Sequence, residues 1–383
     1  MRKNYLFIFG FFVLALVVYA IFMRRGFQPY NYFLPLANAM LKGKIDVAGA
    51  AVLSELIPIN GKYFVVFPPV PALLLTPAAA IWGMKFNQAI ASVFWGATAV
   101  AVFAAIASHI FKKSSTTVWL TLLFAFGTNF FFLAIIGNGW YLAQVVGIFF
   151  LLLSLLAALK KKPFAAGVFL GLSLLSRLPL FLAFPAILYV LIKDNKKSWL
   201  KISLWFFVPI IAAFLFYGYY NFLRFGSFFE TGYSLIPGVL NLPRYQQGIF
   251  SLSYIPRSFM EYVGLMPQFL HKFPYIFPTD SGMAVWLTTP ALLLLFWVKK
   301  KDPYLIAFLL TALLIFIFDL AHGENGWRQF GMRYSLDFMI FLLIPLGFVL
   351  ERTKPAYIWT LIILSILINL WGVILFHLGY YPV

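Results

Sequence analysis

Two carboxylates in the first long polar segment of the chain could act as a general base. Glu55 precedes the turn signal Asn60-Gly61 by five residues, and Asp46 lies nine residues before Glu55. A carboxylate held beside a reacting hydroxyl can accept its proton. Asp46 follows Lys42 and Lys44, whose ammonium groups would keep it ionised as an exposed ion-pair partner. We therefore favour Glu55 over Asp46 as the base, and either residue could instead be purely structural.

The segment around Glu55 also contains a rigid element that turns the chain. Residues 54–71 read SELIPINGKYFVVFPPVP, with an aromatic pair after the turn and a proline cluster before the next apolar run. A Pro-Pro step cannot lie inside a regular helix, because each ring removes a backbone donor and disfavours the helical conformation of the preceding residue. We expect this element at a membrane surface, with Lys62 and Tyr63 available to contact a substrate, Tyr63 by ring stacking.

Arg177 is the sharpest single candidate for binding a charged ligand. It lies between two short apolar runs, 163–175 and 178–193. An ionisable group at membrane depth indicates function, and the planar fork of a guanidinium suits a phosphate group. The alternative is an arginine that extends to the interface from a helical hairpin.

A polar turn late in the chain, residues 322–337, adds further candidates for substrate binding. It contains Arg328, Arg333 and Asp337. Arg333 and Asp337 are four residues apart at a predicted helix start, so they could form an i,i+4 ion pair instead of contacting a substrate. Glu230, in an earlier polar loop, is a further candidate, with a structural carboxylate in a turn as its alternative.

Composition defines the broad class of the protein. Of 383 residues, 63% are hydrophobic and 10% are charged, and the mean hydropathy is +0.92. Apolar runs close to the roughly 20 residues needed to cross a bilayer recur along the whole chain. The sequence therefore predicts an all-α polytopic membrane protein. The formal net charge of +18 comes from short clusters between apolar runs, where cations orient spans, so no nucleic-acid partner is implied.

The apolar runs predict about eleven transmembrane helices in one integral-membrane domain, residues 1–383. Residues 63–83 are the ambiguous stretch: if they do not cross, the later lysine clusters share one side with Arg2 and Lys3, as the positive-inside bias requires. We therefore expect a juxtamembrane or re-entrant helix there. The predicted spans are 5–23, 88–111, 116–136, 139–159, 163–175, 178–193, 200–222, 282–298, 303–321, 334–350 and 356–378.

This topology predicts a plasma-membrane protein whose N-terminus is cytoplasmic and whose C-terminus and chemistry are outside. Two long polar loops, about 24–87 and 223–281, fall on the outer side, together with most of the acidic residues. The first apolar run ends in Arg24-Arg25 without a small-residue cleavage site, so we interpret it as a retained span and not a signal peptide.

The sequence indicates no metal or redox cofactor. It contains no cysteine, which excludes disulfides and thiolate metal sites. His271, His322 and Glu324 could be imagined as metal ligands, but their spacing matches no zinc or iron pattern, and we expect a solvated outer turn instead.

Several short motifs, in this order, resemble those of the GT-C-type membrane glycosyltransferases, the superfamily of protein O-mannosyltransferases and lipid A aminoarabinose transferases. Within that superfamily the pattern is similar to a prokaryotic family 39-like subgroup. The motifs are Asn60-Gly-Lys-Tyr-Phe with Pro68-Pro69, Gly167 to Pro179 around Arg177, Asn221-Phe-Leu-Arg224-Phe-Gly-Ser, Glu230-Thr-Gly-Tyr233, and Gly331-Met-Arg333-Tyr-Ser-Leu-Asp337-Phe.

The resemblance implies a sugar transferase whose donor is a polyprenyl-phosphate-linked sugar and whose acceptor is a protein, a glycan or a lipid. These transferases generally keep an acidic residue just after the first span, and here that position falls near Tyr30-Asn31, where no carboxylate stands. Two alternatives therefore stay open: a transporter or flippase of a lipid-linked sugar, and a non-catalytic lipid-binding membrane protein.

Overall fold

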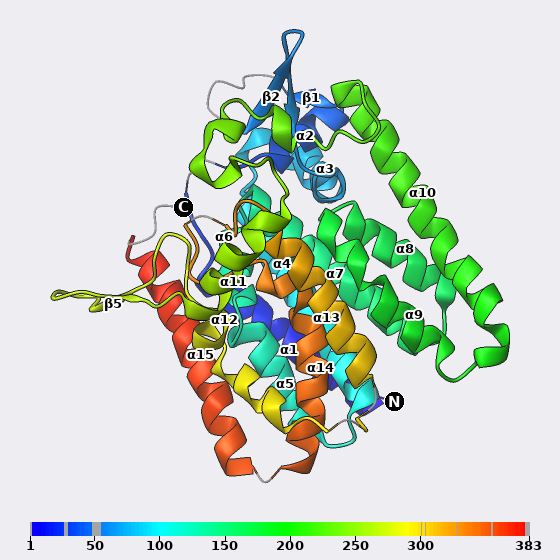
Figure 1. Cartoon of the computed structure of the whole chain (residues 1–383), viewed down its shortest axis with the longest axis vertical. Helices are drawn as coiled ribbons and strands as arrows, with labels where there is room; N and C mark the ends of the chain where they lie inside the picture. Colours follow the sequence, from blue (N-terminus) through cyan, green and yellow to red (C-terminus); the bar gives the residue numbers. More distant parts are fainter. Residues whose placement is uncertain are drawn as a thin grey trace.

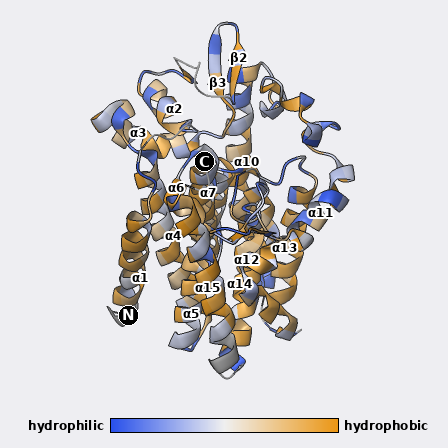
Figure 2. Cartoon of the chain, turned by 90° about the vertical axis from the view of Figure 1, so that its left-hand side faces the viewer, coloured by the Kyte–Doolittle hydropathy of each residue, from blue (hydrophilic) through white to orange (hydrophobic). Residues whose placement is uncertain are grey.

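The protein is a bundle of apolar helices with a polar cap at one end (Figures 1 and 2). The computed structural model describes residues 2–26, 30–47, 55–299, 301–302, 304–326, 328–353 and 355–379. The α-helices are α1 Arg2–Ile21, α2 Phe33–Met40, α3 Val70–Trp82, α4 Gln88–Ile110, α5 Ser114–Phe126, α6 Phe130–Ile136, α7 Gly139–Leu159, α8 Pro163–Leu174, α9 Phe184–Ile192, α10 Trp199–Phe225, α11 Ile255–Gly264, α12 Val285–Thr288, α13 Leu305–Leu320, α14 Ser335–Arg352 and α15 Pro355–His377.

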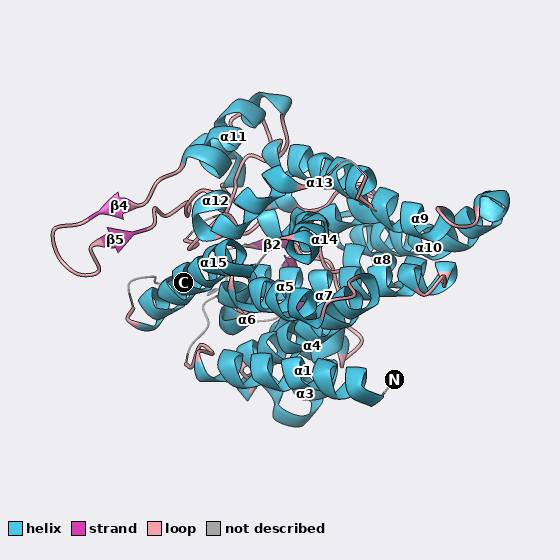
Figure 3. Ribbon diagram, turned by 90° about the horizontal axis from the view of Figure 1, so that it is seen from below, coloured by secondary structure: helices cyan, strands magenta, loops and turns pink. Residues whose placement is uncertain are grey.

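Two small antiparallel sheets complete the fold. The first contains β1 Asp46–Val47, β2 Leu56–Ile59 and β3 Lys62–Val65 in the order β1-β3-β2, and its β2-β3 hairpin turns at Asn60-Gly61 as the sequence predicts. Both turn residues have positive φ, a conformation that asparagine and glycine tolerate. The second sheet, β4 Gln268–Phe269 with β5 Ile276–Phe277, projects sideways from the bundle (Figure 3).

Each of the eleven predicted spans contains helix, but the helices differ in length and regularity. Within the described residues, four are long and apolar enough to cross a membrane: 88–110, 139–159, 196–225 and 359–377. The pair α5 and α6, bent by 51°, would make a fifth span. The predicted span 282–298 is instead the short α12 followed by a 3₁₀ segment, Pro290–Trp297, because Pro290 interrupts the helix. The predicted all-α membrane class is confirmed, whereas helix length supports four or five full spans and not a count of eleven.

The first polar loop leaves and re-enters the bundle at the same end. The side-chain amide of Asn87, just before α4, donates to the carbonyl of Arg24, just after α1, at 3.1 Å. The loop between them forms the cap, with α2 packed on α3 beside the first sheet (Figure 1). The 13-residue α3 therefore does not traverse the bundle, and α2 and α3 are the juxtamembrane helices that the sequence predicts for this loop.

The lysine-rich turns meet at the other end of the bundle. The backbone amides of Lys112 and Lys113 donate to a carboxylate oxygen of Glu351 at 2.7 and 3.0 Å. Lys161 pairs with Asp194 at 2.8 Å. These contacts join turns that are distant in the sequence, and the N-terminus lies at this same end (Figure 2).

Close helix packing positions the chain around Arg177. Gly167 and Gly171 lie four apart on α8, and a Cβ at Gly167 would come within 2.1 Å of the backbone oxygen of Phe206 on α10. Small residues at this spacing let two membrane helices approach closely. Helix α7, most of whose residues are buried, also packs against α8. The end of α8, and Arg177 just after it, is thus held between two helices.

Candidate active site

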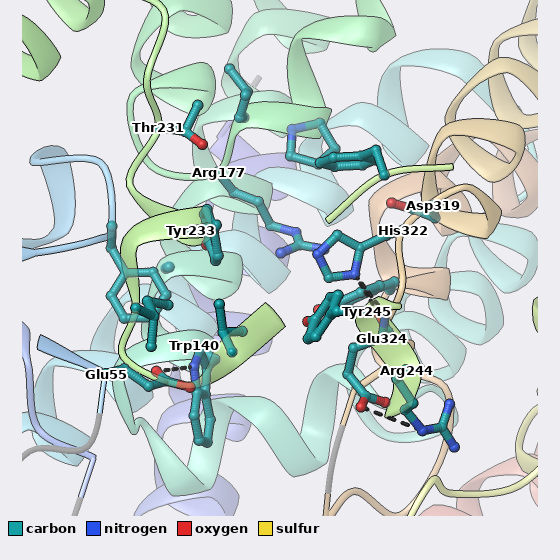
Figure 4. A pocket seen from close by; sticks show the side chains of 18 of the residues that line it. Glu55, Trp140, Arg177, Thr231, Tyr233, Arg244, Tyr245, Asp319, His322 and Glu324 are labelled. Carbon is teal, nitrogen blue, oxygen red and sulfur yellow. Dashed lines mark hydrogen bonds and ion pairs between the residues drawn. The ribbon is translucent and has the colours of Figure 1, made fainter. Parts of the chain in front are cut away.

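A cavity of about 810 Å³ opens at the capped end of the bundle (Figure 4). Its wall combines the first polar loop, the start of α7, the break after α8, the loop 231–245, the end of α13 and the turn 322–334. Segments from residue 55 to residue 334 therefore meet in one site.

Glu55 lines one side of the cavity and Asp46 does not. The Glu55 Oε2 atom accepts a hydrogen bond from the indole nitrogen of Trp140 at 2.8 Å. Burial raises the pKa of Glu55 to about 7, although the Trp140 hydrogen bond, the Arg333 charge and the Tyr32 hydroxyl each lower it. A carboxylate with this pKa is well matched to proton transfer near neutral pH. Asp46 lies in β1, opposite Phe64 of β3, outside the cavity lining.

Arg333 is a buried cation with unused hydrogen-bond donors at the same side of the cavity. Its side chain is 7% exposed, and Nη2 donates to the Tyr334 hydroxyl at 3.3 Å. Among the described residues, its Nε and Nη1 have no hydrogen-bond partner. The guanidinium carbon lies 4.8 Å from the Tyr334 ring centre and 5.6 Å from that of Trp140. Such a cation, lining the cavity, is a ready anion site.

Arg177 also lines the cavity, but its Nε and Nη2 donors are already engaged. Its Nε lies 2.9 and 2.7 Å from the two carboxylate oxygens of Asp337, and its Nη2 lies 2.6 Å from Oδ2. Gln144 of α7 also donates to Asp337, at 2.6 Å. The proposed i,i+4 ion pair between Arg333 and Asp337 is therefore wrong. The partner of Asp337 comes from 160 residues earlier, which leaves Arg333 available.

Asp337 itself is fully buried and does not line the cavity. It fixes Arg177, so any effect that it has on a substrate is indirect.

The other sequence candidates lie outside the cavity lining. Lys62 and Tyr63 lie on β3 next to the hairpin turn, and both are exposed. Glu230 accepts hydrogen bonds from the Gly232 amide at 2.7 Å and the Ser234 hydroxyl at 3.1 Å, which matches its structural alternative. That turn orients the cavity residues Thr231 and Tyr233. The backbone carbonyl of Arg328 accepts a hydrogen bond from the Tyr141 hydroxyl at 3.3 Å.

The turn that carries His322 and Glu324 faces the cavity, and both residues are partly exposed. Both line the cavity, and His322 Nδ1 lies 2.6 Å from the carbonyl oxygen of Glu324. Burial lowers the pKa of His322 to about 4, so its ring is neutral near pH 7. Glu324 Oε2 lies 3.5 Å from Arg244 Nε, and Arg244 Nη1 lies 3.1 Å from Glu261 Oε1. Among the described residues, no group of three acidic or histidine side chains is placed to hold a metal ion.

Sequence reasoning missed several cavity residues besides this pair. Trp140, Tyr233, Tyr245 and Tyr334 supply aromatic walls, and Asp319 closes the side opposite Glu55 (Figure 4). Residue type gave no usable signal for the aromatic residues, because 20% of the chain is aromatic, although Tyr233 and Tyr334 belong to motifs named above. Asp319 did give one: it is an acid at the end of an apolar run, where a charge at membrane depth indicates function.

Solved structures of membrane transferases share this architecture. The crystal structure of ArnT from Cupriavidus metallidurans bound to undecaprenyl phosphate matches with a TM-score of 0.53 and 15% sequence identity, over 92% of this chain and 61% of that chain. The apo Archaeoglobus fulgidus oligosaccharyltransferase matches with a TM-score of 0.51 and 12% identity, over 96% of this chain and 55% of that chain. No protein-family model and no curated protein sequence matches the chain.

The helical bundle with its capped cavity therefore has the GT-C-type membrane glycosyltransferase fold. The resemblance seen in the motifs is confirmed at this level. The chain spans less than two thirds of the length of either solved protein.

Proposed function

We propose that the protein transfers a sugar from a polyprenyl-phosphate carrier to an acceptor hydroxyl in this cavity. The observation that carries the proposal is the arrangement around Trp140. The indole nitrogen holds the Glu55 carboxylate at 2.8 Å, and the ring lies 5.6 Å from the Arg333 guanidinium. A proton acceptor and an anion site thus share one rigid aromatic side chain.

The residues fit the chemistry of glycosyl transfer. Glu55 takes the proton of the acceptor hydroxyl as its oxygen forms a bond to the anomeric carbon. The bond from that carbon to the carrier phosphate breaks, and its electron pair leaves with the phosphate. The free Nε and Nη1 of Arg333 would stabilise the negative charge that the phosphate gains. The proposal uses no metal ion.

The fold likeness supports a lipid-linked donor, since the ArnT structure is bound to undecaprenyl phosphate. Because the cavity opens at the end opposite the lysine-rich turns, the positive-inside bias supports a site on the outer face of the plasma membrane. The transferred sugar would be a hexose or a pentose, and a protein, glycan or lipid hydroxyl would serve as the acceptor.

The proposal is tested with purified protein in proteoliposomes that contain a radiolabelled polyprenyl-phosphate hexose and an acceptor extract. We expect label in the acceptor fraction and release of sugar-free polyprenyl phosphate, both lost in the Glu55→Gln variant. Movement of the intact labelled carrier between leaflets without its cleavage would instead identify a transporter. Carrier binding with neither outcome would identify a non-catalytic lipid-binding protein.

A further inference from the structure

Asp319 places an unused carboxyl oxygen in the cavity wall. It lies in the last turn of α13, its side chain is 2% exposed, and it lines the cavity. Its Oδ2 has no hydrogen-bond partner among the described residues. Buried polar atoms in proteins are nearly always paired, so an unpaired one that faces a cavity indicates a group that binds there.

The neighbouring cation does not satisfy Asp319. Arg177 is close enough to influence Asp319 electrostatically, but its Nε and Nη2 point to Asp337. The neighbouring His322 ring has its Nδ1 at the Glu324 carbonyl, 2.6 Å away. A ligand hydroxyl that donates a hydrogen bond in the cavity would supply the missing partner of Asp319 Oδ2.

The position of Asp319 shows which part of a substrate can reach it. It faces the cavity from the side opposite Glu55 and Trp140, with the Tyr245 and His322 rings between them (Figure 4). The free donors of Arg333 mark the place of the carrier phosphate. The reacting acceptor hydroxyl belongs at Glu55. The sugar connects the carrier phosphate at Arg333 to the acceptor hydroxyl at Glu55, and it is the part of the substrate that carries several hydroxyls. An aromatic ring such as that of Tyr245 suits the apolar face of a sugar.

We propose that Asp319 accepts a hydrogen bond from a hydroxyl of the transferred sugar and thereby selects the sugar that the carrier brings. This inference rests on the proposed glycosyl transfer and deepens it. It predicts that Asp319 contributes to binding of the sugar-loaded carrier but not of the carrier phosphate alone.

The experiment compares binding of two probes by titration calorimetry in detergent. One is farnesyl phosphate, and the other is farnesyl phosphate carrying mannose, glucose, galactose, N-acetylglucosamine or arabinose, tested in turn. In the unaltered protein we expect at least one sugar-loaded probe to bind roughly tenfold tighter than farnesyl phosphate, as one hydrogen bond to a charged group provides. Asp319→Ala should remove this difference and leave farnesyl phosphate binding unchanged.

Asp319→Asn keeps a carbonyl oxygen of the same shape and should retain part of the preference; it also serves if the alanine variant does not fold. Asp194→Ala, at the opposite end of the bundle, is the control for loss of an acid, and all variants are compared by thermal unfolding. The inference is overturned if no sugar-loaded probe binds tighter than farnesyl phosphate, or if Asp319→Ala and Asp319→Asn both keep the full preference. If the unaltered protein binds no farnesyl phosphate at all, the proposed function itself fails.

Discussion

Glu55 can act as a base only when it is ionised, and burial raises its pKa to about 7. At pH values below this pKa, the ionised fraction falls about tenfold per pH unit, so kcat/KM for transfer should fall by the same factor. Above pH 7 the profile should level. A kcat/KM profile between pH 5 and 8.5 measures this, and a flat profile would exclude Glu55 as the base.

The Glu55→Gln variant tests the same residue independently of pH. Transfer should fall by about two orders of magnitude while carrier binding persists, because glutamine keeps the shape but cannot accept the proton.

Since the pKa of Glu55 is raised in the fold, its ionised form destabilises the folded protein as the pH rises above the pKa that Glu55 has in the unfolded chain. The glutamine variant should therefore show a higher Tm than the unaltered protein at pH 8, and a smaller gain at pH 5. Asp46→Asn is the matched control; loss of transfer there instead would move the base to Asp46.

Arg333 is expected to bind the carrier phosphate through donors that no described residue uses. Arg333→Ala should weaken binding of farnesyl phosphate by roughly ten- to a hundredfold, since a charged hydrogen bond is lost, with little change in Tm. Arg333→Lys should restore only part of the affinity, because a point charge replaces a planar fork. Unchanged affinity in both variants, measured by calorimetry, would remove Arg333 from the phosphate site.

At the level of elements, one carboxylate joins three parts of the bundle. Asp337 on α14 accepts from Arg177 after α8 and from Gln144 on α7. The ion pair is largely shielded from solvent, since the Arg177 side chain is 15% exposed and the Asp337 side chain is 0% exposed. Its main role is therefore to hold the break after α8 in the cavity wall, although Arg177 still presents an edge to the cavity.

Breaking the Arg177–Asp337 ion pair should reduce the stability of the fold more than it reduces the affinity for a substrate. Arg177→Leu leaves a buried carboxylate without its cation and should lower the free energy of unfolding by about 3–5 kcal/mol. Replacing both Arg177 and Asp337 by leucine should cost less than the sum of the losses caused by Arg177→Leu and Asp337→Leu alone. Chemical denaturation in detergent measures all three variants. Additive losses would show that the two side chains do not depend on each other.

A second set of hydrogen bonds, made by Arg224 at the end of α10, positions the loop that carries Glu55. Arg224 donates to the backbone carbonyl of Val66 at 3.3 Å and to that of Val65, the last residue of β3, and its Nη2 donates to Asn221 at 2.6 Å. Its guanidinium also lies 4.0 Å from the Tyr220 ring centre. Since β3 pairs with β2, which begins one residue after Glu55, Arg224 supports the base without touching the cavity.

Arg224→Ala should therefore lower kcat while leaving farnesyl phosphate affinity unchanged, because the sheet next to Glu55 loses its anchor. Arg224→Lys should recover part of kcat through one donated hydrogen bond. The pH profile of kcat/KM is the decisive readout: a displaced Glu55 has a different burial and so a different apparent pKa. A fall in the amount of folded protein with kcat and the pH profile unchanged would assign Arg224 to stability alone.

At the scale of the whole molecule, the two ends of the bundle carry different chemistry. The lysine-rich turns meet at one end and the cavity opens at the other. The chain lacks cysteine, so single cysteines report membrane sidedness without a background. Cysteines at Ser114 and Ser198 should be labelled only from the cytoplasmic side, and a cysteine at Ser253 only from outside. Labelling of Ser114 and Ser198 from outside would place the cavity in the cytoplasm.

The sequence alone determined the features that depend on composition and on neighbouring residues. Apolar runs define membrane helices and Asn60-Gly61 defines a hairpin turn, because each of these is decided within a few residues of chain. The motif order also indicated the GT-C-type fold that the solved structures confirm. Helix lengths were less predictable, since bends such as that between α5 and α6 depend on packing.

The tertiary structure decided which polar side chains are used and which remain free. Spacing made Asp337 a partner of Arg333, four residues away, yet the fold brings Arg177 to it from 160 residues earlier. It likewise places His322 in the cavity wall and leaves Lys62 exposed on the hairpin. In each case the pairing depends on contacts between segments far apart in the sequence, and burial then sets the charge and hydrogen-bonding state of the group. Neither quantity can be read from local spacing, because both arise only when the distant segments pack together.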